Sequence, residues 1–141
     1  KCLIHRDLQS QNIMIRYGSP ILIDFQGMRI DSPFYDLGSL LYDPYVVLTD
    51  AERFELLQYY YRLMERNQDW KAYQEMFLLA SVQRLMQALG AYGYISLKLK
   101  KKAFMEHIPN GMTNLLDATV KTGRLPYLES LCRRSISTLS P

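Results

Sequence analysis

The fold of this chain is decided by residues 5–12, which read HRDLQSQN. This stretch places the carboxylate of Asp7 five residues before the carboxamide of Asn12. A loop of that length can hold the carboxylate over a reacting hydroxyl group while the amide oxygen reaches a metal ion. An aspartate can accept the hydroxyl proton, and a neutral amide oxygen suits a hard cation. We therefore predict that Asp7 is a catalytic base and that Asn12 is a magnesium ligand.

A second acidic residue, Asp24, directly follows the apolar run at residues 21–23. That run and an earlier one at residues 13–15 flank the turn-forming sequence YGSP, residues 17–20, so the pattern predicts a β-hairpin. Asn12 would enter the first strand and Asp24 would leave the second, side by side at one end. Magnesium needs only one or two protein oxygens beside those of phosphates and waters. We therefore predict Asp24 as the second metal ligand.

Everything after Pro33 is predicted to be helical. The expected helices span residues 34–47, 50–66, 69–92, 109–121 and 126–139. Thr49 and Glu52 form a capping-box pattern for the second helix, Asp69 is the expected cap of the third, and Gly123 closes the fourth. A small β element at residues 1–30 on a helical subdomain at residues 33–141 gives an α+β fold that is mostly α.

Composition excludes several classes of protein. The chain is 48% hydrophobic with a net charge of +3, which is too weakly basic for a nucleic-acid binder. No apolar run approaches the roughly 18 residues that would span a bilayer, and two distant cysteines favour a reduced, cytoplasmic protein. The lysine-rich run at residues 98–102 is expected to be a solvated loop, with contact to an anionic substrate or partner as the alternative.

Asp36 opens the first predicted helix, and only eleven residues separate it from Asp24. Residues 5–12 have the kinase catalytic-loop form H-R-D-L-x-x-x-N, and in the kinase fold an aspartate at the place of Asp36 hydrogen-bonds to the backbone of that loop. Capping its own helix is the alternative role, and both can hold at once. A eukaryotic protein kinase needs an activation segment and an A-P-E motif in the interval. There is no room for them, so a protein kinase is disfavoured.

The motifs HRDLQSQN, IDFQG and YDLGSLLYDPY together resemble the C-terminal lobe of the aminoglycoside phosphotransferase and choline kinase superfamily. Residues 82–90 and 126–128 resemble more narrowly the bacterial kinases that phosphorylate the anomeric hydroxyl of N-acetylmuramate and N-acetylglucosamine. The resemblance implies a phosphotransferase that uses ATP and Mg²⁺, with a small sugar-like hydroxyl compound as acceptor. It also implies Asp7 as the base and Asn12 and Asp24 as the metal ligands.

Further residue roles follow from the same resemblance. Met14 and Ile23 would form the lower wall of the adenine pocket, although hairpin core is an equal alternative. Asp43 would bind acceptor groups, with a helix-end or turn role as the alternative. His5 is expected to be a packed imidazole that supports the loop.

The chain departs from the kinase pattern at two positions. Asp24 and Phe25 match the first two residues of the kinase motif D-F-G. Gln26 stands where that motif has glycine, and we expect Gly27 to supply the backbone freedom instead. Gln9 stands where protein kinases carry a lysine that contacts phosphate. This substitution leaves one positive charge fewer near the transferred group. We expect Arg6 to pair with an acidic neighbour.

No glycine-rich loop and no strand lysine with a helix glutamate partner occurs in the sequence. We therefore expect a fragment that is inactive alone and works with its own N-terminal ATP-binding lobe. An aminoglycoside or an amino alcohol such as choline is the alternative acceptor. A non-catalytic kinase-like scaffold is the alternative class. Most other acidic residues lie on predicted outer helix faces, which favours a neutral or acidic sugar over a cationic acceptor.

Overall fold

The computed structural model describes residues 1–64 and 69–139, in which two small two-stranded sheets precede the helices. This is the mostly helical α+β arrangement that the sequence predicts. The strands are β1 (Cys2–Ile4), β2 (Ile13–Arg16), β3 (Ser19–Leu22) and β4 (Arg29–Asp31). The helices are α1 (Pro33–Leu41), α2 (Asp50–Leu63), α3 (Trp70–Leu97), α4 (Ile108–Thr122) and α5 (Pro126–Leu139), with 3-10 turns at Ser10–Asn12, Phe25–Gly27 and Lys102–His107.

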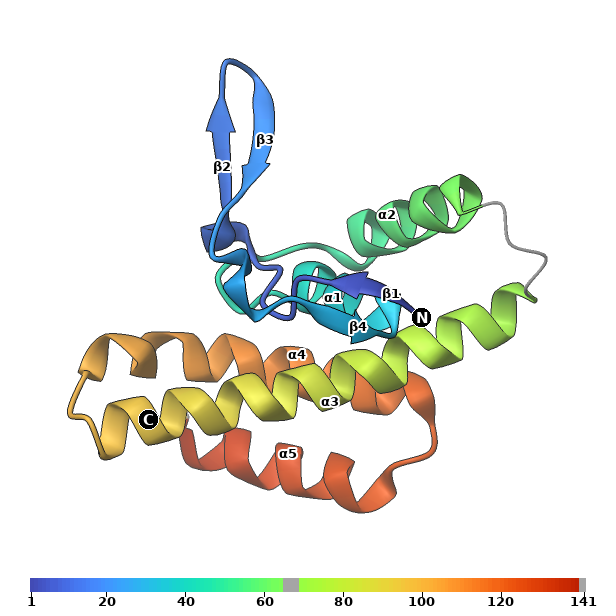
Figure 1. Ribbon diagram of the computed structural model, residues 1–141. Helices are drawn as coiled ribbons and strands as arrows, with labels where there is room; N and C mark the ends of the chain where they lie inside the picture. The colour runs from blue at the N-terminus through green and yellow to red at the C-terminus, as the bar shows by residue number, and fades with distance from the viewer. Residues whose placement is uncertain (65–68, 140–141) are drawn as a thin grey trace.

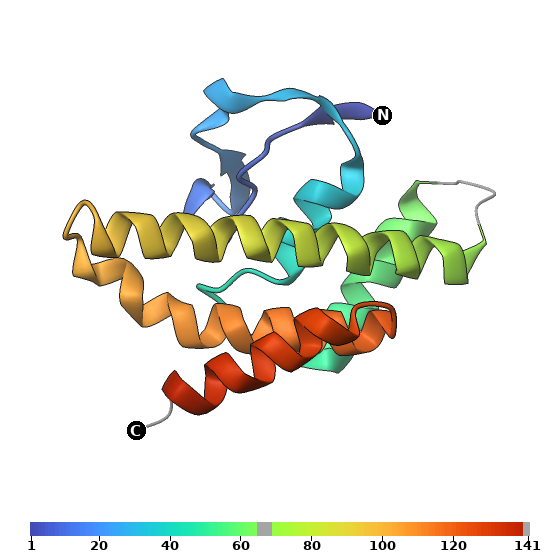
Figure 2. The same cartoon turned by 90° about the horizontal axis from the view of Figure 1, so that it is seen from below.

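The long helix α3 is the centre of the helical body (Figures 1 and 2). It packs against α1 and α4, and α4 packs against α5. The hairpin β2–β3 projects away from the helices (Figure 1), and its side chains are mostly exposed. The predicted packing of the hairpin on the helical bundle is therefore wrong. The hairpin joins the body only at its open end, so no helix lies beneath its apolar side chains.

The hairpin itself is confirmed, but its turn is shorter than predicted. The turn consists of Tyr17 and Gly18, whose φ angles are 52° and 76°. Positive φ at both central residues is what a two-residue type I′ turn needs. Ser19 and Pro20, predicted as part of the turn, are the first residues of β3.

Strand β4 is not predicted by the sequence. It pairs antiparallel with β1, with Cys2 opposite Asp31. Its three residues carry charges at both ends, Arg29 and Asp31, so they lack the apolar run by which strands are recognised. The pairing brings the chain back to its start and sets Ile4, at the end of β1, opposite Arg29, at the start of β4. The loop of residues 5–12 and the segment after Asp24 are therefore held at the same end of this sheet.

Two helices end at other residues than predicted. Helix α1 ends at Leu41 instead of residue 47, because a proline at position 44 disfavours helical conformation in the residue before it. Helix α3 continues to Leu97 instead of residue 92. Gly93, the glycine of the added stretch, weakens a helix by only about 1 kcal/mol relative to alanine, and Tyr92 directly before it is buried.

The predicted helix caps are confirmed. Thr49 Oγ1 accepts a hydrogen bond from the Glu52 backbone N–H at 3.2 Å, and Glu52 Oε2 accepts one from the Thr49 N–H at 2.7 Å. Asp69 caps α3, and Gly123 ends α4 with a φ of 61°. The predicted end of α2 at Arg66 lies outside the described residues.

The hydrophobic core lies where α1, α3 and α4 meet. Its most buried members include Leu41, Tyr42, Phe77, Leu85 and Ala118, each at most 3% exposed. These side chains fix how α3 crosses α1, and this crossing determines what α3 can present to the loop of residues 5–12. Of the helices in the described part of the chain, none is both long and apolar enough to cross a membrane.

Candidate active site

Asp36, in the first turn of α1, holds the loop of residues 5–12 in shape. Its Oδ2 accepts a hydrogen bond from the His5 backbone N–H at 2.5 Å, and its Oδ1 accepts one from the Arg6 N–H at 2.9 Å. Arg6 has a φ of 76°, a conformation that residues other than glycine rarely adopt. The two bonds compensate for this conformation, so Asp36 fixes the peptide groups directly before Asp7.

His5 lies beneath the loop and is 3% exposed. Its Nε2 donates a hydrogen bond to the backbone carbonyl of Ile23 at 2.9 Å. The imidazole therefore ties the loop to the residue that precedes Asp24. This is the packed, supporting position that the sequence analysis expects.

Asp7 carries the partly exposed carboxylate of the loop, with 43% of its side chain accessible. Its Oδ1 lies 2.5 Å from Arg84 Nη2 and also accepts a hydrogen bond from Gln9 Nε2. Its Oδ2 has one longer contact, 3.3 Å to Asn12 Nδ2. Two donors thus hold one oxygen, and the other keeps capacity for an incoming hydroxyl group.

Arg84 is a residue of the site that no sequence motif predicts. Arg84 comes from α3, between the core residues Val82 and Leu85, and only 10% of its side chain is exposed. A buried arginine needs partners because an unpaired buried charge is very unfavourable. In the sequence, the sign of this role is a charged residue on an otherwise apolar face of the predicted helix. The sequence does not indicate which residue pairs with the arginine.

Asn12 and Asp24 lie at the open end of the hairpin, where the Ile23 N–H donates to the Asn12 carbonyl at 3.0 Å. Asn12 Nδ2 donates to the Asp7 carbonyl at 2.9 Å, which leaves the side-chain oxygen of Asn12 for a ligand. Asp24 has a φ of 61°, and its Oδ1 accepts a hydrogen bond from Gln26 Nε2 at 2.7 Å. The hairpin therefore brings two oxygen donors to one end.

This donor set fits Mg²⁺. Magnesium is bound through one or two side-chain oxygens together with waters and substrate phosphates, and Asn12 and Asp24 supply that number. Within residues 1–64 and 69–139, no three His, Cys, Asp or Glu side chains gather into a metal-binding group. An all-protein cage of the zinc kind is therefore not formed by the described residues.

Met14 and Ile23 lie on the projecting hairpin and are 54% and 39% exposed. The alternative role as hairpin core is wrong, because a two-stranded hairpin without a helix beneath it buries neither side chain. Ile15 and Ile21 are exposed beside them. Exposed apolar side chains on a hairpin of this kind fit a binding surface, and the assignment of Met14 and Ile23 to an adenine pocket stays a prediction.

Asp43 is used by the backbone and is 2% exposed. Its Oδ2 accepts a hydrogen bond from the Ser10 N–H at 2.7 Å, and its Oδ1 accepts one from the Tyr45 N–H at 2.9 Å. Both oxygens are therefore engaged. The geometry favours the turn role over the predicted acceptor-binding role, and Asp43 supports the catalytic loop from the segment after α1.

The predicted roles of Gly27 and Arg6 both differ in the structure. The left-handed backbone conformation belongs to Asp24 itself, so the prediction that Gly27 supplies the backbone freedom is wrong. Arg6 does not pair with an acidic residue there; its Nη1 donates to the Gly27 carbonyl at 3.2 Å. Through this bond the loop of residues 5–12 also holds the segment that follows Asp24.

The basic run at residues 98–102 follows the end of α3 at Leu97 and is exposed throughout. Across the described ranges, none of its lysines takes part in an ion pair. Both observations fit the solvated loop that the sequence analysis expects.

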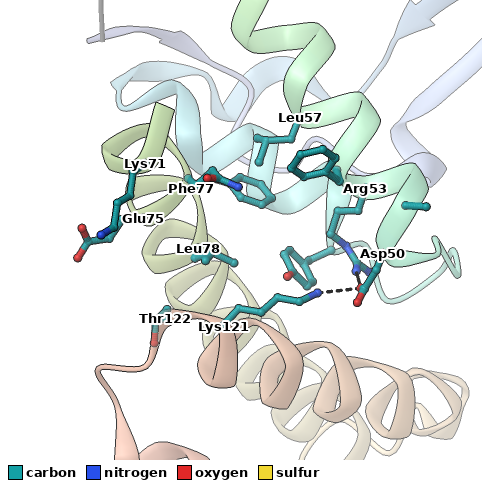
Figure 3. Close-up of a pocket in the computed structure, with 13 residues that line it drawn as sticks. Asp50, Arg53, Leu57, Lys71, Glu75, Phe77, Leu78, Lys121 and Thr122 are labelled. Carbon is teal, nitrogen blue, oxygen red and sulfur yellow. Dashed lines mark hydrogen bonds and ion pairs between the residues drawn. The ribbon is translucent and has the colours of Figure 1, made fainter. Parts of the chain in front are cut away.

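A large cavity of ≈ 880 Å³ lies elsewhere, between α2, α3 and α4 (Figure 3). Of the described residues, none from the stretch 1–41 lines it. Its charged groups are partly paired with one another, as Lys121 Nζ lies 2.7 Å from Asp50 Oδ1. The cavity is therefore separate from the loop that carries Asp7, and we do not include it in the candidate active site.

Comparison with known families gives one match. The model of a family described as the phosphotransferase enzyme family, APH, matches residues 1–76, which is 76 of the 141 residues and thus more than half of the chain. The match covers Asp7, Asn12, Asp24 and Asp36 and ends before Arg84. No curated protein matches the chain.

Proposed function

This chain belongs to the phosphotransferase enzyme family, and we propose that it carries the residues with which the γ-phosphate of ATP is transferred to a hydroxyl group of a small, sugar-like molecule. The acceptor that we propose is an amino sugar of the N-acetylmuramate or N-acetylglucosamine type, phosphorylated at its anomeric hydroxyl. The observation that carries the proposal is that Asn12 Nδ2 contacts Asp7 Oδ2 and that Ile23, the residue before Asp24, is hydrogen-bonded to the Asn12 carbonyl at the open end of the hairpin.

In the proposed reaction, Asp7 Oδ2 takes the proton of the acceptor hydroxyl. The new bond forms between the acceptor's hydroxyl oxygen and the γ-phosphorus. The bond from the γ-phosphorus to the bridging oxygen breaks, and its electron pair leaves with ADP. Asn12 and Asp24 hold Mg²⁺, which neutralises charge on the phosphate oxygens when it is bound. Reactions of this class depend on positioning and charge stabilisation more than on a strongly basic group.

The exposed hairpin supports a role in nucleotide binding. Met14 and Ile23 present apolar surface beside the proposed metal ligands, where an adenine ring could pack with its phosphates directed to Asn12 and Asp24. We propose that a further lobe covers the other side of the nucleotide. The 141-residue chain assayed alone is therefore expected to have negligible activity.

The position of Asp43 supports a neutral or acidic acceptor. Amino alcohols and aminoglycosides carry positive charge, and their sites need free carboxylates near the catalytic base. Asp43 is the carboxylate that the sequence predicts to bind the acceptor, but its two oxygens accept backbone hydrogen bonds. A cationic acceptor would therefore find less compensation here than a sugar would.

The test is an acceptor screen on the full-length protein that contains these residues. ADP release is measured with N-acetylmuramate, N-acetylglucosamine, an aminoglycoside and choline. We expect turnover with an amino sugar and a loss of at least about 100-fold in kcat for Asp7→Asn. Glu55→Gln, at an exposed position on α2, is the matched control and should leave kcat unchanged.

The same screen separates the alternatives. Turnover with choline or the aminoglycoside alone would keep the phosphotransferase and change the acceptor. Binding of ATP and Mg²⁺ without ADP release for any acceptor would favour the non-catalytic scaffold instead. Turnover that persists unchanged in Asp7→Asn would contradict the assignment of the base.

A further inference from the structure

Arg84 is a buried arginine that reaches the catalytic loop from α3. Its Nη2 lies 2.5 Å from Asp7 Oδ1, and its Nε donates a hydrogen bond to Ser39 Oγ at 3.0 Å. The residue is 9% exposed, and the central carbon of its guanidinium group lies 6.0 Å from the ring centre of Tyr35. Because a buried charge must be paired to be tolerated, Asp7 compensates the charge of Arg84, and Ser39 fixes its orientation.

A close contact between α1 and α3 brings Arg84 within reach of the loop. A Cβ atom on Gly38 would lie 2.8 Å from Ser81 Oγ and 2.9 Å from Ser81 Cα, so the absence of a side chain at Gly38 allows this approach. Arg84 follows Ser81 by three residues and therefore leaves α3 on the same side. Ser39 follows Gly38 directly on α1. One helix contact thus sets the positions of both Arg84 and its anchor.

Arg84 also supplies a charge that the loop does not. Gln9 stands where protein kinases have a phosphate-contacting lysine, and its amide donates to Asp7 instead. Arg6, a cation of the loop, is directed to the Gly27 carbonyl. An uncompensated carboxylate would repel the γ-phosphate, and this repulsion is stronger where water is excluded. Of the described residues, Arg84 is the one whose positive charge contacts Asp7.

We propose that Arg84 is a positioning residue for Asp7 in phosphoryl transfer, an inference that rests on the proposed function. Arg84 holds Oδ1 of Asp7, so that Oδ2 faces the acceptor hydroxyl and takes its proton while the bond to phosphorus forms and ADP leaves. Its charge offsets that of Asp7 next to the incoming phosphate. Arg84 acts through Asp7 and touches no reacting atom.

The first test compares Arg84→Gln, Arg84→Lys and wild type in the full-length protein with the acceptor that the screen identifies. Misplacing a catalytic group by about 1 Å can cost about 100-fold in rate, and we expect a loss of that size in kcat for Arg84→Gln. The KM for the acceptor should change by less than about threefold, whereas the KM for ATP should rise because the charge of Asp7 is no longer offset beside the γ-phosphate. Arg84→Lys keeps the charge but not the fork geometry and should lose about tenfold.

The matched control is Arg134→Gln, at an exposed arginine on α5, which should leave kcat unchanged. Ser39→Ala keeps the ion pair and removes only its anchor, so it tests the role even where Arg84→Gln fails to fold. We expect it to lose about fivefold in kcat, a loss within the range for one misplaced group, and to fold with a somewhat lower Tm because the buried Arg84 Nε–H loses its acceptor.

Chemical rescue distinguishes positioning from a general structural role. Guanidinium ion should restore the kcat of Arg84→Ala by about tenfold, while the same concentration of sodium chloride should not. A variant that is merely unstable would lose further activity, since guanidinium weakens folded proteins. Arg84→Gln or Ser39→Ala with the kcat of wild type, or Arg84→Ala without rescue, would overturn the role. A wild-type protein that phosphorylates no acceptor would overturn the proposed function instead, and this inference with it.

Discussion

Asp36 shows how one carboxylate shapes the site at the scale of a residue. Helix α1 begins at Pro33 with Ser32 at the N-cap position, so Asp36 lies inside the first turn and not at the cap. Its two oxygens instead accept hydrogen bonds from two consecutive backbone N–H groups, those of His5 and Arg6. A carboxylate in this position orients the peptide chain into Asp7, and an amide could satisfy only one of the two donors.

We predict that Asp36→Asn lowers both activity and stability. The variant turns one acceptor oxygen into a donor that faces a backbone N–H, and an unsatisfied partner of this kind costs about 1–3 kcal/mol in the free energy of unfolding. We expect kcat to fall about 10- to 100-fold, because Asp7 loses its fixed backbone. Urea unfolding and steady-state kinetics measure the two effects, with Glu55→Gln as the control. An unchanged kcat would contradict the supporting role.

The two cysteines should differ in reactivity. Both are free thiols, and Cys132 is 1% exposed while Cys2 is partly accessible. Burial raises the pKa of the Cys132 thiol, which lowers the fraction of the reactive thiolate. In the folded protein we expect a thiol-specific chromogenic reagent to modify Cys2 rapidly and Cys132 only on unfolding. The single variants Cys2→Ser and Cys132→Ser assign the two phases, and equally fast phases would disprove the difference.

Which site residues can be predicted from sequence depends on whether their partners are local. Asp7 and Asn12 lie in one loop, so their spacing alone indicated a site. Arg84 lies 77 residues from Asp7, and only the crossing of α1 and α3 reveals the contact. For Asp43 the pattern gave the residue type but not the two backbone groups that use its oxygens. Spacing therefore locates a candidate carboxylate, and packing determines its role.

At the scale of elements, features set by a few neighbouring residues were predictable. The capping box of α2 and the end of α4 at Gly123 depend on side-chain and backbone preferences within one turn, and both appear as predicted. Strand β4 depends on pairing with β1 across the sequence, and the projection of the hairpin depends on which helices lie beneath it. Neither is encoded in a local pattern.

The contact of α1 with α3 at Gly38 makes a prediction about these elements. Gly38→Ala would place a methyl group 2.8 Å from Ser81 Oγ, so α3 must shift away from α1. Overpacking of this kind costs about 1–3 kcal/mol in the free energy of unfolding. The shift should also weaken the contact of Arg84 with Asp7 and lower kcat. Thermal or urea unfolding and kinetics give both readouts.

The matched control for Gly38→Ala is Gly90→Ala. Gly90 lies within α3, and a Cβ atom there would meet nothing within 4 Å. Alanine should therefore stabilise the protein by about 0.5–1 kcal/mol through its higher helix propensity. If Gly38→Ala stabilised the protein as much as Gly90→Ala does, the contact would not be restrictive.

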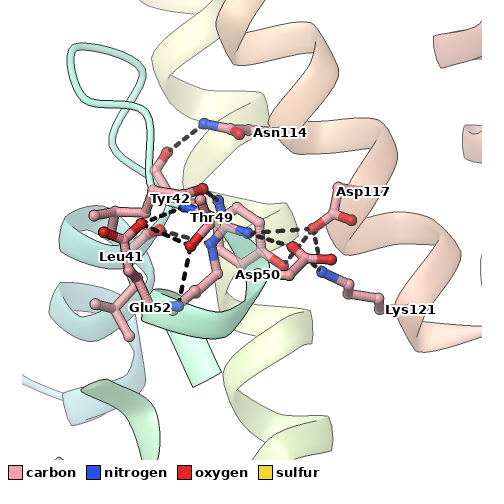
Figure 4. A network of polar contacts seen from close by, with 10 residues as sticks. Leu41, Tyr42, Thr49, Asp50, Glu52, Asn114, Asp117 and Lys121 are labelled. Atoms are coloured by element: carbon pink, nitrogen blue, oxygen red, sulfur yellow. Dashed lines mark hydrogen bonds and ion pairs between the residues drawn. The ribbon is translucent and has the colours of Figure 1, made fainter. Parts of the chain in front are cut away.

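At the scale of the whole molecule, a polar network joins α2 to the rest of the helical body (Figure 4). Arg53 is 8% exposed and donates to the Leu41 carbonyl at 2.9 Å and to Asp50 Oδ1 at 3.0 Å. Lys121 of α4 bonds to Asp50 and Asp117 at 2.7 and 2.8 Å. Helix α2 is separated from parts of α3 and α4 by the large cavity. The polar bonds therefore hold α2 where apolar side chains do not pack against these helices.

Acid should loosen this connection. The hydrogen bond from Lys121 lowers the pKa of Asp50. A carboxyl group whose folded pKa is lowered stabilises the fold above its unfolded pKa of about 3.9 and loses that contribution as pH falls through the folded pKa. Because Asp50 is largely exposed, the contribution at pH 7 should be only about 0.2–1 kcal/mol. We therefore expect Asp50→Asn to lower the unfolding free energy by this amount at pH 7 and by progressively less as the pH falls below about 3.9. Urea unfolding across that range measures the difference. The Asp50→Asn and Lys121→Gln double-mutant cycle isolates the pair, and a coupling energy that stayed constant down to pH 3 would rule the connection out.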